Sequence, residues 1–259
     1  MLTSVDHEKS NLITEAYQEI GLDCLVCIGG NGTQKTTNLL AEHGMNVIGL
    51  PKTIDNDIWG TDETFGFDTA VNIATDAIDR LHSTACSHKR VMLVEVMGHR
   101  AGWIALHAGM AGGADVILLP ELGFDEQKVY DAILGRAHKG KPHSIVVIAE
   151  GLKFPDKTRV IDYLTEKIEE KTGIETRKTV LGYIQRGGTP SPYDRNLATR
   201  FGGYATELIA NKQYGRMVCM QKGRISSIPL KEVSGKLKLV TPDNDLLVQG
   251  KRMGVSFGI

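Results

Sequence analysis

Residues 51–57, Pro-Lys-Thr-Ile-Asp-Asn-Asp, bring together the side chains best suited to acid–base and phosphate chemistry. They follow the apolar run 47–50, which is typical of a buried strand. Open α/β sheets bind ligands in the crevice outside the carboxyl ends of their strands. A carboxylate placed there can take the proton of an attacking hydroxyl during phosphoryl transfer. Thr53 and Asn56 can hold the acceptor, and Lys52 can offset charge on the moving group. The alternative is an idle hydrogen-bonded Asx turn.

A second cluster is the glycine loop 29–33, Gly-Gly-Asn-Gly-Thr, between an apolar run at 24–28 and a helical pattern that starts near Thr33. Glycines let a ligand approach the backbone, and the amides at a helix N-terminus attract phosphate oxygens. Thr33 can cap the helix or contact an anion. A plain turn is the alternative, and the lysine–hydroxyl pair of a Walker motif does not follow at the required place.

Two further clusters follow apolar runs. Residues 97–103, Met-Gly-His-Arg-Ala-Gly-Trp, place His99 and Arg100 where they can reach an anion. Glu150 ends the run 145–149, where a carboxylate can accept hydrogen bonds from hydroxyl groups. The alternatives are a capped or solvent-facing histidine and a surface glutamate.

Basic residues form the last group. Arg177, the segment 183–188 (Tyr-Ile-Gln-Arg-Gly-Gly) and the pair Lys89-Arg90 offer guanidinium groups, which hold phosphate through a rigid fork. Each of these residues alone is more often a solvated surface charge.

Short apolar runs alternate with helical patterns along the chain, which indicates βαβ units and doubly wound parallel sheets. The strands are expected at 24–28, 46–50, 91–96, 115–119, 144–149, 178–182 and 217–221. The helices are expected at 7–20, 33–43, 68–84, 100–111, 125–139, 160–171 and 193–210. We therefore expect an α/β fold whose strands are shared by two sheets, with residues 236–240 as an edge strand or hairpin.

Composition sets limits on function. Hydrophobic residues make up 41%, and the formal net charge of −1 gives no bulk attraction to nucleic acid or to an anionic membrane. Cys24 and Cys27 have C-x-x-C spacing, but positions three apart on a strand face opposite ways. We expect buried free thiols, which fit a reducing, cytoplasmic location.

Taken in order, these clusters resemble the 6-phosphofructokinase family from Gly21 to about Met220. The most specific pieces are residues 51–57, the Gly-Thr-Asp at 60–62, Met97-Gly98 and the segment 185–195. The resemblance implies phosphoryl transfer from ATP to the 1-hydroxyl of fructose 6-phosphate. A lipid or NAD kinase remains the alternative, supported by the glycine loop alone.

The resemblance also implies roles for individual residues. Asp55 would be the base, with Lys52, Thr53 and His99 completing the catalytic group. The sugar phosphate would be held by Thr53, Asp55, Arg90, Met97, Gly98, His99, Glu150, Arg177, Tyr183 and Arg186. Gly30, Asn31, Gly32 and Thr33 would carry the nucleotide phosphates, and Asn31 and Asp57 would hold Mg²⁺. Arg90 would reach in from a neighbouring subunit of a homodimer or homotetramer.

Departures from the family pattern leave the phosphoryl donor open. Asn31, His99 and Tyr183 stand where members usually have aspartate, arginine and histidine. Gly32 is typical of members that use ATP, and Lys52 of members that use pyrophosphate. Because Gly32 leaves room for a nucleotide, we expect ATP, with pyrophosphate as the alternative.

The resemblance implies two lobes and a missing beginning. A donor lobe is expected at 1–66 plus about 186–237, and a sugar-phosphate lobe at 67–185 plus about 238–259. The family's opening strand and its glycine–proline loop have no match before Met1. The first lobe is therefore expected to be truncated and to expose apolar surface. A non-catalytic fragment or regulatory subunit is the remaining alternative.

Overall fold

The computed structural model describes residues 7–154, 156 and 158–259. The chain forms two compact units: Met1–Asp68 with Pro190–Lys238, and Thr69–Thr189 with Leu239–Ile259. Within the described residues, no helix has the length and apolar character needed to cross a membrane.

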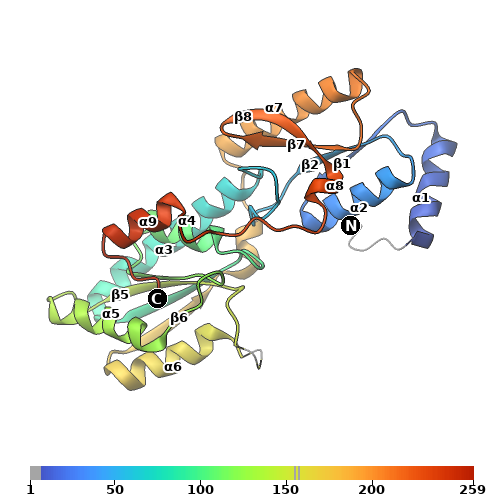
Figure 1. The fold of residues 1–259 in the computed structure, drawn as a ribbon. Coiled ribbons are helices and arrows are strands. Elements are labelled where there is room, and N and C mark those ends of the chain that lie inside the picture. Colours follow the sequence, from blue (N-terminus) through green and yellow to red (C-terminus); the bar gives the residue numbers. More distant parts are fainter. Residues whose placement is uncertain (1–6, 155, 157) are drawn as a thin grey trace. The chain divides into compact units, whose positions relative to one another are not determined.

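The first unit contains a sheet in the order β1-β2-β7-β8 (Figure 1). Its elements are α1 (His7–Ile20), β1 (Leu25–Gly29), α2 (Asn31–Glu42), β2 (Val47–Pro51), α7 (Pro192–Ala210), β7 (Arg216–Gln221), β8 (Arg224–Pro229) and α8 (Leu230–Val233). Strands β1, β2 and β7 are parallel, and β8 pairs with β7 in the antiparallel sense. Strands β2 and β7 are covered on both faces, because α2 and α8 pack on one face and α7 on the other. Burial on both faces explains why β2 is apolar throughout.

Strand β1 lies at the edge of this sheet and exposes apolar side chains. Val26 is 38% exposed and Ile28 is 57% exposed. Interior strands of a doubly wound sheet are covered on both faces, whereas one face of β1 is open within the described residues.

The second unit contains a fully parallel sheet in the order β4-β5-β3-β6. Its elements are α3 (Phe67–His88), β3 (Val91–Val96), α4 (Trp103–Ala111), β4 (Val116–Leu118), α5 (Glu126–His138), β5 (Ser144–Ala149), α6 (Val160–Thr172), β6 (Thr176–Val180), the 3₁₀ helix η1 (Gly182–Arg186) and α9 (Asp245–Arg252). Helices α5 and α6 pack against one face of the sheet, and α4 lies against β4 and β5. All six residues of both β3 and β5 are buried.

The expected α/β class with parallel sheets is confirmed, but the C-terminal part differs from the sequence prediction. Residues 236–240 form no strand, and Leu237 makes only an isolated bridge to Ile58. The hairpin lies earlier, where β7 and β8 are joined by Lys222 and Gly223. Both joining residues have positive φ, 51° and 75°, as a type I′ hairpin turn requires. Helices α8 and α9 were also not predicted.

Several predicted boundaries were wrong, among them the end of α3, which lies at His88 rather than at residue 84. Helix α2 begins at Asn31 rather than near Thr33. Helix α4 begins at Trp103 rather than at residue 100, because Gly98 and His99 form a turn with positive φ. Strand β6 spans Thr176–Val180, and the chain then enters η1.

The cysteines are free thiols, but they are less buried than expected. Cys219 is buried, Cys24 and Cys27 are half-buried, and Cys86 is exposed. Burial raises the pKa of the Cys24 and Cys27 thiols, so both favour the neutral form.

Candidate functional site

The glycine loop and the 51–57 segment lie side by side because β1 and β2 are neighbouring parallel strands. The buried side chain of Gln34 joins them, since its Nε2 donates to the carbonyl oxygens of Gly29 at 2.9 Å and Leu50 at 3.0 Å. The backbone N–H of Lys52 also donates to the Gly29 carbonyl, at 3.1 Å. The structure therefore brings the two predicted loops to one edge of the sheet. Sequence analysis missed Gln34, a polar residue in the first turn of a helix that carries no motif of its own.

The glycine loop leads directly into α2 and leaves the helix N-terminus open. Gly30 is the N-cap, makes no side-chain cap and is followed by no acidic residue in the first turn. Such an end presents backbone N–H groups and a positive dipole to an anion. Of the two roles considered for Thr33, helix capping is not observed, because Gly30 is the N-cap. The Thr33 side chain lies next to Gly29, where a Cβ would be 2.2 Å from Thr33 Oγ1. A Cβ at Gly32 would meet nothing within 4 Å, so that position borders open space.

The predicted base, Asp55, is fixed by a local turn with Thr53. Thr53 Oγ1 donates to Asp55 Oδ2 and accepts the Asp55 backbone N–H, both at 3.2 Å. Thr53 also lies next to the glycine loop, since a Cβ at Gly30 would come within 3.5 Å of it. The turn is compatible with both interpretations of this segment, but its place beside the glycine loop and the open N-terminus of α2 favours a chemical role.

Asn56 gives this loop its shape. It is buried and has φ of 51°, a left-handed conformation that asparagine tolerates better than most residues. The residues on its two sides differ in accessibility: Asp55 is half-buried, and Asp57 is only 1% exposed.

The two predicted Mg²⁺ ligands lie close together. Asn31 Nδ2 donates to the backbone carbonyl of Asp57 at 3.4 Å. Mg²⁺ prefers oxygen ligands and usually binds one or two carboxylates together with substrate phosphates and water. Amide and carboxylate groups therefore fit Mg²⁺ in kind. The Asp57 carboxylate oxygens are buried, so Asn31 is the more accessible of the two.

A lysine that sequence analysis assigned to an edge strand contacts this same loop. Lys238 Nζ donates to Asn56 Oδ1 at 2.9 Å and to the carbonyl oxygens of Thr61 at 3.0 Å and Asp62 at 2.6 Å. Burial lowers the pKa of Lys238 to about 8, although the nearby carboxylates raise it. No sequence signal linked Lys238 to Asn56, because 182 positions separate them.

In the second unit, Met97, Gly98 and His99 form a turn beyond the carboxyl end of β3. Glu150 Oε1 accepts the backbone N–H groups of Gly98 at 3.2 Å and His99 at 2.8 Å. Buried Gln185 accepts the Met97 N–H at 2.8 Å. Glu150 follows β5, so these residues come together because β3 and β5 are adjacent parallel strands. The His99 side chain is exposed.

The second carboxylate oxygen of Glu150 is not used by the turn. Its Oε2 makes no hydrogen bond with the residues that the structure describes, while Oε1 is occupied by the turn. A hollow of about 500 Å³ lies beside it, lined by Glu95, Glu150, Leu152, Lys153 and Arg159. Arg159 pairs with the nearly buried Glu95, and neither residue was predicted as part of the site.

Tyr183 and Arg186 lie on η1, which follows the carboxyl end of β6. The Arg186 guanidinium carbon is 5.7 Å from the centroid of the Tyr183 ring, a cation–π contact. The Tyr183 side chain is 80% exposed, so its ring and the arginine face solvent together. Since Leu181 donates its N–H to the Glu95 carbonyl, η1 lies at the same sheet edge as Gly98 and Glu150.

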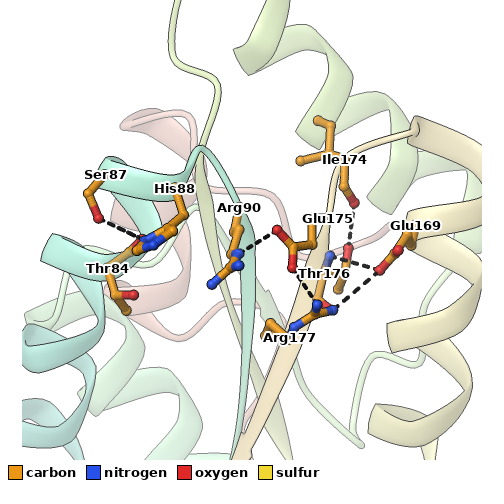
Figure 2. Close-up of polar contacts among 9 residues, drawn as sticks. All are labelled: Thr84, Ser87, His88, Arg90, Glu169, Ile174, Glu175, Thr176 and Arg177. Carbon is orange, nitrogen blue, oxygen red and sulfur yellow. Dashed lines mark hydrogen bonds and ion pairs between the residues drawn. The ribbon is translucent and has the colours of Figure 1, made fainter.

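Arg90 and Arg177 lie together, but at the opposite edge of this sheet. Figure 2 shows both arginines on Glu175: Arg90 Nε donates to Oε2 at 2.6 Å, and Arg177 Nη2 donates to Oε1. Arg90 precedes β3, and Val91 is paired with Thr176 at the amino end of β6. The six residues of β3 place about 20 Å between this edge and the Gly98 turn.

Glu175 is therefore the shared partner of two predicted phosphate ligands. The hydrogen bond from Arg90 and the charge of Arg177 lower the pKa of Glu175. Arg177 Nη1 also approaches Glu169 at 3.7 Å (Figure 2). Glu175 was not predicted as part of the site. Its place two residues before Arg177, close to the start of a strand, could have indicated that it pairs with an arginine.

The fold and these loops define a two-unit α/β protein whose strand ends suit phosphorylated ligands. The family model described as phosphofructokinase matches residues 2–209. The chain belongs to the phosphofructokinase family, so the alternative of a lipid or NAD kinase is set aside.

Individual relatives agree with this assignment. The chain is 64% identical over 253 residues to ATP-dependent 6-phosphofructokinase 3 of Bacteroides thetaiotaomicron, covering 98% of this chain and 75% of that protein. It is 46% identical to the pyrophosphate–fructose 6-phosphate 1-phosphotransferase of Streptomyces coelicolor, covering 95% of this chain and 75% of that protein. The phosphofructokinase structure from Saccharomyces cerevisiae superimposes with a TM-score of 0.81 at 28% identity, over 88% of this chain and 35% of that one.

Proposed function

We propose that the protein transfers the terminal phosphoryl group of ATP to the 1-hydroxyl of fructose 6-phosphate, a glycolytic step of the cytoplasm. One observation carries this proposal: Asp55, held by Thr53, lies on a strand-end loop packed beside an open glycine loop and helix N-terminus. A base and a phosphate cradle are the two parts that phosphoryl transfer to an alcohol requires. The names of the ATP-dependent relatives support the donor and the acceptor.

In this mechanism the first unit binds the donor and supplies the base. The N–H groups at the start of α2 hold phosphate oxygens, with Gly30 and Gly32 allowing close approach. Asp55 takes the proton of the attacking hydroxyl, and Thr53 keeps its carboxylate oriented. Lys52 is exposed and offsets negative charge on the moving phosphoryl group.

Asn31 and Asp57 would hold Mg²⁺ in this unit, with substrate phosphates completing its oxygen ligands. The ion would neutralise charge on the donor phosphates. Since Asn31 is a neutral amide, it is a weaker ligand than the aspartate usual in the family.

The second unit binds the sugar phosphate. Glu150 Oε2 accepts sugar hydroxyls, and the turn of Met97, Gly98 and His99 contacts the sugar. Arg186, stacked on Tyr183, holds the 6-phosphate.

Arg90 and Arg177 serve a neighbouring copy of the chain. Their place at the amino edge of the sheet, about 20 Å from the Gly98 turn by strand length, supports this assignment. The expectation that Arg90 alone acts between subunits therefore extends to Arg177, because both share Glu175. A homodimer or homotetramer is the assembly that satisfies this requirement.

Pyrophosphate is the second candidate donor. Lys52 and the 46% identical Streptomyces coelicolor enzyme favour it, whereas the open space at Gly32 favours ATP. A coupled assay of fructose 1,6-bisphosphate formation with each donor decides between them. We expect turnover with ATP, and turnover only with pyrophosphate would reverse the donor assignment.

The Asp55→Asn variant tests the base. We expect turnover to fall by about three orders of magnitude or more, consistent with loss of general base catalysis, while fructose 6-phosphate still binds. Turnover close to that of the wild type would contradict the role of Asp55. A folded wild-type chain that makes no product with either donor would instead support a non-catalytic role.

A further inference from the structure

The ammonium group of Lys238 is enclosed by three oxygen atoms. They are Asn56 Oδ1 at 2.9 Å and the carbonyl oxygens of Thr61 at 3.0 Å and Asp62 at 2.6 Å. An ammonium has three N–H donors, and each has an acceptor here. The arrangement is an oxygen cage whose cation is supplied by the chain itself.

All three oxygens belong to the loop that carries the catalytic carboxylate. The same strand-end loop runs from Thr53 to Asp62, with Asp55 and Asp57 on either side of Asn56. The backbone of Lys238 adds a further tie, since its N–H donates to the Asp57 carbonyl at 2.9 Å. Leu237 makes a bridge with Ile58 on the same loop.

The contact with Asn56 has a conformational consequence. Asn56 is held in the left-handed region, which is strained for most non-glycine residues. The hydrogen bond from Lys238 to its side chain opposes relaxation to a right-handed conformation. Such relaxation would turn the peptide groups between Asp55 and Asp57 and move the base.

We propose that Lys238 is a positioning residue for the strand-end loop from Thr53 to Asp62, and that its ammonium group occupies a cage suited to a monovalent cation. The proposal rests on the proposed function, because the loop matters through Asp55. The backbone and amide oxygens lie 2.6–3.0 Å from Lys238 Nζ. A large monovalent ion suits such a site, since carbonyl oxygens can replace the hydration shell of K⁺. Mg²⁺ requires oxygens at about 2.0–2.1 Å, closer than those of the cage.

The test replaces the internal cation with one from solution. Lys238→Ala removes the ammonium and leaves space in the cage, and we expect turnover to fall about 10- to 100-fold. Adding KCl or NH₄Cl should restore turnover by tenfold or more, while tetramethylammonium chloride at equal ionic strength should not. Lys238→Met removes the charge but keeps the volume, so it should lose turnover without rescue.

Lys236→Ala is the matched control. Lys236 is exposed, and its Nζ lies 5.9 Å from the centroid of the Trp59 ring, outside the cage. We expect this variant, like the wild type, to keep its turnover and to show no response to K⁺. Wild-type turnover in Lys238→Ala, or a folded Lys238→Ala that ignores both K⁺ and NH₄⁺, would overturn the proposal.

A thermal melt provides a readout that is independent of catalysis and of the proposed function. K⁺ should raise the melting temperature of Lys238→Ala, but not that of Lys238→Met. If Lys238→Ala folds only in K⁺ or NH₄⁺, the proposal holds, and equal melting curves in all salts would refute it. Absence of product from a folded wild-type chain would remove the proposed function but leave this measurement decisive for the cage.

Discussion

The side chain of Gln34 occupies the space that a Cβ at Gly49 would need. A Cβ built at Gly49 would lie 2.2 Å from Gln34 Oε1, far inside van der Waals contact. Gln34 joins the ends of β1 and β2 through its two hydrogen bonds. Because Gly49 has no side chain, Gln34 can reach this position and hold the two loops that follow the strands. The requirement for glycine here is one of space and not of backbone conformation.

Gly49→Ala should therefore displace Gln34. We expect the free energy of unfolding to fall by about 1–3 kcal/mol, the usual cost of overpacking a core, and turnover to fall with it. Chemical denaturation measures the first effect. The matched control is Gly203→Ala in α7, where a Cβ meets nothing within 4 Å and helix propensity favours alanine by up to about 1 kcal/mol. Equal stabilities for the two variants would contradict this account of Gly49.

Glu150 holds the Gly98 turn through Oε1 and, in the proposed function, binds the sugar through Oε2, so its two variants should differ. Glu150→Gln keeps an acceptor for the Gly98 and His99 N–H groups but loses the charge. Glu150→Ala leaves both groups without that acceptor. We expect kcat/KM for fructose 6-phosphate to fall about tenfold in the first variant and 100-fold in the second, in line with about 1.5–3 kcal/mol for a charge-assisted hydrogen bond. Steady-state kinetics on fructose 6-phosphate checks this order, and the reverse order would contradict it.

Gly32 should decide between donors through charge and not through fit. A side chain there meets no protein atom within 4 Å, so both Gly32→Ala and Gly32→Asp should fold normally. Gly32→Asp places a negative charge at the N-terminus of α2, where it repels nucleotide phosphates. We expect the KM for ATP to rise at least tenfold in Gly32→Asp and much less in Gly32→Ala. Similar values for the two variants would show that volume, and not charge, controls donor binding.

Glu175 should make its contribution to stability at neutral pH and lose it in acid. Its pKa in the folded chain lies below the ordinary glutamate value, so folding favours the ionised form. That contribution is present above the unfolded-state pKa and disappears as the pH falls through the lowered value. The melting temperature of Glu175→Gln should lie below that of the wild type at pH 7, and the difference should shrink towards pH 4.

Glu166→Gln, an exposed glutamate on α6, is the control for this comparison. Its melting temperature should follow that of the wild type across the same range of pH. A difference between Glu175→Gln and the wild type that grows in acid would reverse the assignment.

Sequence alone located most of the secondary structure, because parallel strands buried on both faces are continuous apolar runs. β3 and β5 have the bounds expected from that signal. Strand β8 was not predicted from the sequence, because its hairpin turn is Lys222-Gly223 rather than the more familiar Asn-Gly or Asp-Gly pair. The residues of the candidate site could also be proposed from the sequence, because loops after strands expose polar side chains at one sheet edge.

Sequence determined by itself which residue types the sites contain, since motifs such as 51–57 are local and ordered along the chain. Tertiary structure alone decided which side chains support them. Gln34, Glu175 and Lys238 act through partners that are distant in sequence or carried on neighbouring strands. Strand direction likewise placed Arg90 and Arg177 at the amino edge of their sheet, away from Glu150. Hydrogen bonds and packing depend on distance in space, which the order of residues does not record.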